Sequence, residues 1–135
     1  MDITNKKEKA CGCVIIQDGK VLLVQHNKGH WGFPKGHVEK NENEKETAIR
    51  EVKEETNVDA KIIDDKRYTM EYVTDKGRDK EVVYFIANPI TNEIKPQEEE
   101  IKSVKWVSFS DALKILTYRN TQEFLEEILK ERGLI

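Results

Sequence analysis

Residues 36–58 read GHVEKNENEKETAIREVKEETNV, and the rest of the chain is interpreted around them. Glu51, Glu54 and Glu55 are spaced three and four residues apart, which places their side chains on one face of a helix. Like charges at this spacing repel each other by about a few tenths of a kcal/mol per pair in an isolated helix. Carboxylate oxygens are the ligands that magnesium and manganese prefer. The three glutamates alone leave two interpretations open, a metal site and an ordinary acidic surface in solvent.

The limits of this helix have physical reasons in the sequence. Asn43 is a suitable N-cap, and Glu46 follows three residues later in a capping-box arrangement. Ala48 and Val52 are four residues apart and are expected to face the core. Asn57 is suited to a left-handed conformation just past the helix end. We therefore expect a helix from about residue 43 to residue 56.

The remaining chain predicts an α+β sandwich in one domain, residues 1–135, with a mixed sheet between helices. Strands are expected at residues 9–17, 20–25, 58–64, 67–74, 80–88 and 104–107. Residues 26–38 are rich in Gly and aromatic residues and are interpreted as a loop. Two later helices are expected at residues 111–116, capped by Ser110, and from Asn120 or Thr121, either of which can act as the cap, to Arg132.

Composition narrows the class of protein. Of 135 residues, 37% are hydrophobic and 36% charged, and the net charge of −3 argues against general binding to nucleic acids. The two cysteines, Cys11 and Cys13, lie two apart on a strand, where a disulfide is poorly placed, and no partner cluster for a zinc site accompanies them. No apolar segment approaches the ~20 residues of a membrane span. We therefore expect a soluble, cytoplasmic protein that binds no membrane, and the sequence leaves its oligomeric state open.

The spacing Gly36, Glu42, Arg50-Glu51-Val52, Glu54-Glu55, Val58 resembles the Nudix box, the signature of the Nudix hydrolases. The single departure is Asn57, where that family has Gly, and we expect at most about 1 kcal/mol of lost stability from it. The resemblance implies a Nudix-type α/β/α sandwich. It also implies that Glu51, Glu54 and Glu55, helped by the Gly36 carbonyl, bind Mg²⁺ or Mn²⁺. Arg50 and Glu42 would form an ion pair that orients these carboxylates.

The chemistry implied by the resemblance is hydrolysis of a pyrophosphate link between a nucleoside diphosphate and a further group. Water attacks phosphorus in line while bound metal neutralises the developing charge. Family members take the general base either from the box or from a distant loop. Glu54 is therefore expected as base or ligand, and Glu100 as a third-metal ligand or alternative base. The alternative for residues 98–100 is an ordinary loop in solvent.

The flanking segments resemble one group within that family, the asymmetric diadenosine tetraphosphate hydrolases. The similar segments are residues 31–39, residues 80–87 and the spacing from Glu100 to Trp106. Carried over by position, His30, Lys35 and Lys80 would contact phosphates, and the rings of Tyr72 and Tyr84 would stack on adenine. Each has a plainer alternative. Both tyrosines could be sheet or core residues, Lys80 a solvated strand end, and His30 a loop residue.

Three functional hypotheses follow from these observations. The first is metal-dependent hydrolysis of diadenosine tetraphosphate to ATP and AMP, in an enzyme whose partner is a small-molecule nucleotide. The second is another Nudix pyrophosphohydrolase, acting on oxidised or ordinary nucleoside triphosphates, RNA 5′ ends or inositol pyrophosphates. The third is a non-catalytic nucleotide sensor, which is disfavoured because all the metal-binding glutamates are present.

Overall fold

The structure is a computed structural model that describes residues 7–135. The chain forms strands β1 (Glu8–Gln17), β2 (Lys20–His26), β3 (Trp31–Gly32) and β4 (Lys35–His37), then helix α1 (Glu44–Thr56). It continues with β5 (Ala60–Ile62), β6 (Tyr68–Val73), β7 (Asp79–Pro89) and β8 (Ile101–Ser108), and ends with α2 (Phe109–Ile115) and α3 (Arg119–Glu131). Within this part of the chain, no helix is long and apolar enough to cross a membrane.

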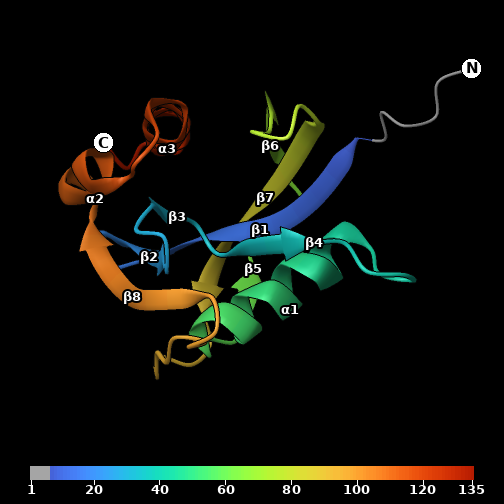
Figure 1. Ribbon diagram of the computed structural model, residues 1–135. Helices are drawn as coiled ribbons and strands as arrows, with labels where there is room; N and C mark the ends of the chain where they lie inside the picture. The colour runs from blue at the N-terminus through green and yellow to red at the C-terminus, as the bar shows by residue number, and fades with distance from the viewer. Residues whose placement is uncertain (1–6) are drawn as a thin grey trace, which may run out of the picture.

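The sheet is mixed, as predicted. Its main path runs β3-β2-β1-β7-β5, while β4 pairs with β1, β6 with β7 and β8 with β2. Strands β1 and β7 pair in parallel at the centre, and the other pairs are antiparallel. Figure 1 shows α1 packed against one side of these central strands and α2 and α3 gathered on the other.

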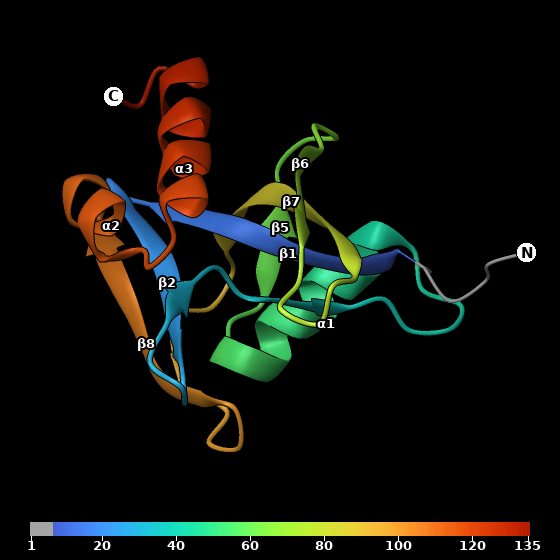
Figure 2. The ribbon, with the colours of Figure 1, turned by 45° about the horizontal axis from the view of Figure 1, so that its top comes forward.

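Alternating residues of the central strands supply two hydrophobic cores. On β7, Val83, Phe85 and Ala87 join the α1 side, while Val82, Tyr84 and Ile86 join the side of α2 and α3. This is the side-chain alternation of a strand buried on both faces. Figure 2 shows β1 crossing between α1 and the two C-terminal helices. The predicted α+β sandwich with a mixed sheet between helices is confirmed.

The ends of α1 agree with the sequence prediction. The Asn43 side chain accepts a hydrogen bond from the Glu46 backbone N–H at 2.8 Å, and the Glu46 carboxylate accepts one from the Asn43 backbone N–H at 2.9 Å. This is the predicted capping box. Asn57 ends the helix with φ 69° and ψ 4°, the left-handed conformation expected of it.

Several boundaries predicted from the sequence are wrong. The segment at residues 26–38 is not all loop, because it contains β3 and β4, which pair with β2 and β1. Helix α2 is capped by Ser108 rather than Ser110, since the Ser108 hydroxyl accepts from the Asp111 backbone N–H at 3.2 Å. Helix α3 begins at Arg119, and its N-cap, Tyr118, makes no side-chain capping bond, so neither Asn120 nor Thr121 is the cap. Strand β5 is shorter than predicted and β8 is longer.

Candidate active site

Arg50 organises the acidic face of α1. Its guanidinium donates two hydrogen bonds to Glu42, from Nε at 2.6 Å and from Nη2 at 3.0 Å. Its Nη1 donates to Glu51 at 2.8 Å and to Glu54 at 3.0 Å, and Nη2 also reaches the His37 carbonyl at 3.0 Å. The hydrogen bonds from Arg50 hold the pKa of Glu42 at about 2. A planar fork of five donors is suited to this task, so Arg50 fixes the carboxylates in place.

Gly36 lies directly against the carboxylate of Glu51. A Cβ atom built on Gly36 would come within 2.0 Å of the Glu51 Oε2 atom. No side chain therefore fits at this position without moving the Glu51 carboxylate. Glycine is needed here because the β4 backbone and α1 approach each other closely at this point.

Glu55 is a buried carboxylate. Its side chain is 4% exposed, and it accepts a hydrogen bond from the Lys35 backbone N–H at 3.2 Å. Burial, followed by the charge of Glu51, raises the pKa of Glu55 to about 8. Burial likewise raises the pKa of Glu51, although Arg50 opposes that shift. The ionised forms of Glu55 and Glu51 are therefore unfavourable here unless a further positive charge compensates them.

This donor set fits a divalent cation. Glu51, Glu54 and Glu55 share one helical face, and Glu100 is close enough that its charge raises the pKa of both Glu51 and Glu55. Among residues 7–135, no three acidic, His or Cys side chains are already gathered at one point; the Arg50 guanidinium holds Glu51 and Glu54 instead. Carboxylate oxygens with uncompensated charge are the ligands that hard cations prefer.

A pocket of about 600 Å³ adjoins the carboxylates, and we call it the cationic pocket. Lys35 links the two, because its backbone bonds Glu55 and its side chain lines the pocket. Lys80, His26 and His30 also line this pocket. Burial, and then the charge of Lys80, lower the pKa of Lys35. The two lysines concentrate positive charge in the pocket, which is suited to a polyanion.

The two histidines of the cationic pocket are stacked. Their ring centroids lie 4.2 Å apart with an interplanar angle of 12°. Burial, and then the neighbouring His30, lower the pKa of His26 to about 4, and burial also lowers the pKa of His30. Both rings are therefore neutral near pH 7. They can donate hydrogen bonds there but carry no charge.

Tyr84 differs from the stacking role predicted for it. It is 3% exposed, and its ring packs edge-on against Phe33 at 5.3 Å and at a tilt of 51° against Phe124 at 5.4 Å between centroids. Although Tyr84 borders the pocket, these neighbours occupy its ring, so the core interpretation holds. The sequence left a core position open as the alternative for Tyr84, and Phe124 of α3 packs over its ring in the structure.

Other aromatic rings are better placed. Tyr72 lies on β6 directly opposite Lys80 on β7 and is half-buried in the pocket wall. Tyr118, which the sequence did not single out, is 55% exposed and lines the same pocket, with its ring centroid 6.0 Å from that of His30. It is brought there by a non-local contact, in which the Trp31 backbone N–H donates to the Thr117 hydroxyl at 2.7 Å. No local pattern signals that contact.

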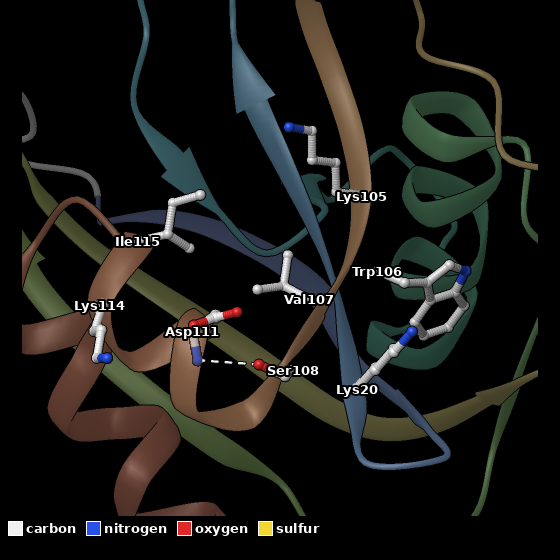
Figure 3. A pocket seen from close by; sticks show the side chains of 8 residues that line it. All are labelled: Lys20, Lys105, Trp106, Val107, Ser108, Asp111, Lys114 and Ile115. Atoms are coloured by element: carbon white, nitrogen blue, oxygen red, sulfur yellow. Dashed lines mark hydrogen bonds between the residues drawn. The ribbon is translucent and has the colours of Figure 1, made fainter.

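A second hollow lies over β8 and α2 and contains Lys20, Lys105 and Lys114. Figure 3 shows these lysine side chains well apart rather than converging, while the Ser108–Asp111 capping bond crosses between them. The Lys105 ammonium instead sits 5.7 Å from the centre of the Trp31 ring. This surface does not adjoin the acidic cluster, and the cationic pocket remains the candidate site.

Comparison with known proteins agrees with this arrangement. The family model described as the NUDIX domain matches residues 6–128. The asymmetrical bis(5′-nucleosyl)-tetraphosphatase of Caenorhabditis elegans is 36% identical over 128 residues, which span 88% of this chain and 92% of that protein. The enzyme of the same name from Mus musculus is 31% identical over 140 residues, spanning 88% and 91%. The crystal structure of a C. elegans Ap4A hydrolase binary complex superposes with a TM-score of 0.84 at 32% identity, covering 95% of this chain and 99% of that one.

Proposed function

Because the chain belongs to the Nudix hydrolase family and hydrolyses nucleotide pyrophosphate links, we propose that its substrate is diadenosine tetraphosphate, cleaved asymmetrically to ATP and AMP. The observation that carries this proposal is the joining of the acidic cluster to the cationic pocket through Lys35. A long polyphosphate can reach from the carboxylates along the basic wall. The pocket also offers aromatic side chains for a base beyond the phosphates.

The metal is proposed to be Mg²⁺ or Mn²⁺, held by Glu51, Glu54 and Glu55 with the Gly36 carbonyl. When bound, it would lower the pKa of a water molecule and neutralise charge on phosphate oxygens. Arg50 keeps the carboxylates in register through its contacts with Glu42, Glu51 and Glu54. Buried carboxylates of this kind are unfavourable without a cation, which supports the assignment.

In the proposed reaction, the water oxygen forms a bond to phosphorus in line with the leaving phosphate oxygen. The phosphorus–oxygen bond on the side opposite the attacking water breaks, and the leaving nucleoside phosphate takes the electron pair of that bond. A carboxylate takes the proton of the attacking water. Glu54, whose side chain is half exposed, is proposed either as this base or as a metal ligand, and Glu100 is the alternative base or a further metal ligand.

Substrate contacts are proposed to divide along the pocket. Lys35, Lys80 and His30 hold phosphate oxygens, with the lysines supplying charge and the neutral histidine supplying a hydrogen bond. Tyr72 and Tyr118 are proposed to stack on adenine, which is worth about 1–3 kcal/mol per base. Tyr84 is proposed not to contact adenine but to support the pocket through its packing against Phe33.

A substrate panel with product identification tests the proposal. The panel contains diadenosine tetraphosphate, ATP, an oxidised guanosine triphosphate, a capped RNA 5′ end and an inositol pyrophosphate, each with Mg²⁺ and with chelator. We expect diadenosine tetraphosphate to have the highest kcat/KM and to yield equal amounts of ATP and AMP. Two ADP per substrate, or a higher kcat/KM on another compound, would reject this substrate. Absence of turnover on all of them would favour a sensor.

A further inference from the structure

Asn27, at the start of the turn between β2 and β3, is tied to a segment far away in the sequence. Its backbone N–H donates to the Glu100 carbonyl at 2.9 Å. Its side-chain Nδ2 donates to the Glu99 carbonyl at 2.8 Å and reaches the Glu98 carbonyl at 3.5 Å. Asn27 thus donates hydrogen bonds to the carbonyls of three successive residues. Its amide group supplies the two N–H donors that this arrangement uses.

The same segment is fastened on its other side to the end of α1. The Gln97 backbone N–H donates to the Glu55 carbonyl at 3.3 Å, and the Lys95 N–H to the Thr56 carbonyl at 2.9 Å. Within the segment, Ile101 N–H donates to the Gln97 carbonyl at 2.8 Å, and the Ile101 side chain is buried. The turn at residues 98–100 is therefore held between α1 and the end of β2.

The pairing of β2 with β8 is irregular at this point. Gln25 pairs with Ser103, but His26 pairs with Ile101, so the register shifts by one residue just before Asn27. An irregularity of this kind bends the strand and redirects the side chains beside it. Because the β2–β8 pairing ends here, the carbonyls of residues 98–100 do not pair with a strand. They accept hydrogen bonds from Asn27 instead.

The hydrogen bonds from Asn27 hold a negatively charged turn in place. Glu98, Glu99 and Glu100 are consecutive and exposed, so they repel one another as well as the carboxylates of α1. Without a tie, that repulsion would move Glu100 away from Glu51 and Glu55. Asn27 itself does not line the cationic pocket, although its neighbour His26 does. Its influence on the site must therefore pass through the turn.

We propose that Asn27 is a positioning residue, which holds Glu100 beside the metal-binding face of α1 by bonding the carbonyls of residues 98–100. This inference rests on the proposed role of Glu100. It predicts that loss of the Asn27 amide lowers metal affinity and kcat while leaving KM for the nucleotide nearly unchanged. Supporting groups around metal ligands typically change affinity or activity by about 10–100-fold.

The experiment uses Asn27→Ala and Asn27→Asp, since Asp keeps the shape but replaces the donor by a charged acceptor. Asn92→Ala, an exposed asparagine in the preceding loop, is the control. Mn²⁺ affinity is measured by electron paramagnetic resonance titration without substrate, and kcat and KM by turnover. Both Asn27 variants should weaken Mn²⁺ binding by about 10-fold, whereas Asn92→Ala should match the wild type. Melting temperatures verify that all variants are folded.

A double-mutant cycle with Glu100→Gln separates the possible outcomes. If Asn27 acts through Glu100, adding Asn27→Ala to Glu100→Gln should cause no further loss of Mn²⁺ affinity. Equal losses in both backgrounds would overturn the inference, and so would wild-type Mn²⁺ affinity in Asn27→Asp. If Glu100→Gln itself changes neither affinity nor kcat, the proposed role of Glu100 fails and the inference fails with it. The choice of substrate would stand independently of that result.

Discussion

The backbone N–H of Lys35 donates to the Glu55 carboxylate over 3.2 Å, while the side chain of the same lysine lines the cationic pocket. One residue of the short strand β4 therefore connects the acidic face of α1 to the surface proposed to bind phosphates. The arrangement places a negative cluster, which binds cations, next to a positive wall, which binds anions. A metal–polyphosphate complex complements both.

Neutralising the acidic cluster should abolish turnover. Glu54→Gln and Glu55→Gln should each lower kcat by at least ~100-fold, as for loss of a key electrostatic group. Glu55 is buried rather than facing solvent, and burial raises its pKa to about 8, so Glu55→Gln removes a group whose ionised form is unfavourable without metal. The metal-free melting temperature of Glu55→Gln should therefore equal or exceed that of the wild type. Near wild-type kcat in both variants would reject this site.

Gly36→Ala tests the close approach of β4 to α1. The added Cβ would meet the Glu51 carboxylate at 2.0 Å, and that carboxylate is held by Arg50 at 2.8 Å. The carboxylate can move, so the protein should fold, but a metal ligand would be displaced. We expect Mn²⁺ affinity to fall by about 10-fold or more. Gly19→Ala, where nothing lies within 4 Å of the added Cβ but φ is +75°, serves as a control in which stability falls and metal affinity does not.

The aromatic residues of the pocket should separate into two classes. Tyr72→Ala and Tyr118→Ala should raise KM for diadenosine tetraphosphate by roughly 10-fold, from ~1–2 kcal/mol of lost stacking, with kcat little changed. Tyr84→Ala should instead reduce the free energy of unfolding by ~3–5 kcal/mol, as for other large-to-small changes in a core. KM and melting temperature, measured on the same preparations, distinguish the classes. A large rise in KM for a stable Tyr84→Ala variant would contradict the core assignment.

Two features of Asn57 affect the stability of the end of α1 in opposite directions. Its left-handed φ of 69° favours glycine, by up to about 1 kcal/mol. Its side chain, however, donates to the Glu93 carbonyl at 2.9 Å, a bond worth about 0.5–1.5 kcal/mol. Asn57→Gly should therefore leave both activity and the melting temperature nearly unchanged. Asn57→Ala loses the bond and keeps the left-handed strain, so its melting temperature should fall by several degrees.

Acid should weaken the attachment of α1 through Glu44. Arg67 donates hydrogen bonds to Glu44 at 2.7 and 2.8 Å. These bonds hold the pKa of the Glu44 carboxyl at about 2, below the ordinary value of 4.5. A lowered pKa in the folded state means that the stabilisation is complete above pH 4.5 and is lost as the pH falls toward 2. In urea titrations, Glu44→Gln should therefore lose less stability than the wild type between pH 5 and pH 3. Glu123→Gln, which alters an exposed ion pair with Arg119, should follow the wild-type curve.

Sequence alone identified the helix that carries the acidic cluster, its capping box and its left-handed end at Asn57. These features depend on neighbours three or four residues apart, and helical geometry makes such neighbours visible in one dimension. Gly36, Glu42 and Arg50 were identified through the resemblance to the Nudix box instead, because the contacts Glu42–Arg50 and Gly36–Glu51 join residues eight and fifteen positions apart. The central strands were likewise found from their long apolar runs.

Tertiary structure decided which residues meet across the fold. The sequence left Tyr84 open between adenine stacking and a place in the core, and the packing of Phe33 and Phe124 against its ring makes it part of the core. Tyr118 reaches the pocket, and Asn27 reaches the turn at residues 98–100, through contacts between segments more than 70 residues apart. Such contacts depend on how strands pair and helices pack, which the local pattern does not encode because many distant residues of the same type could occupy each place.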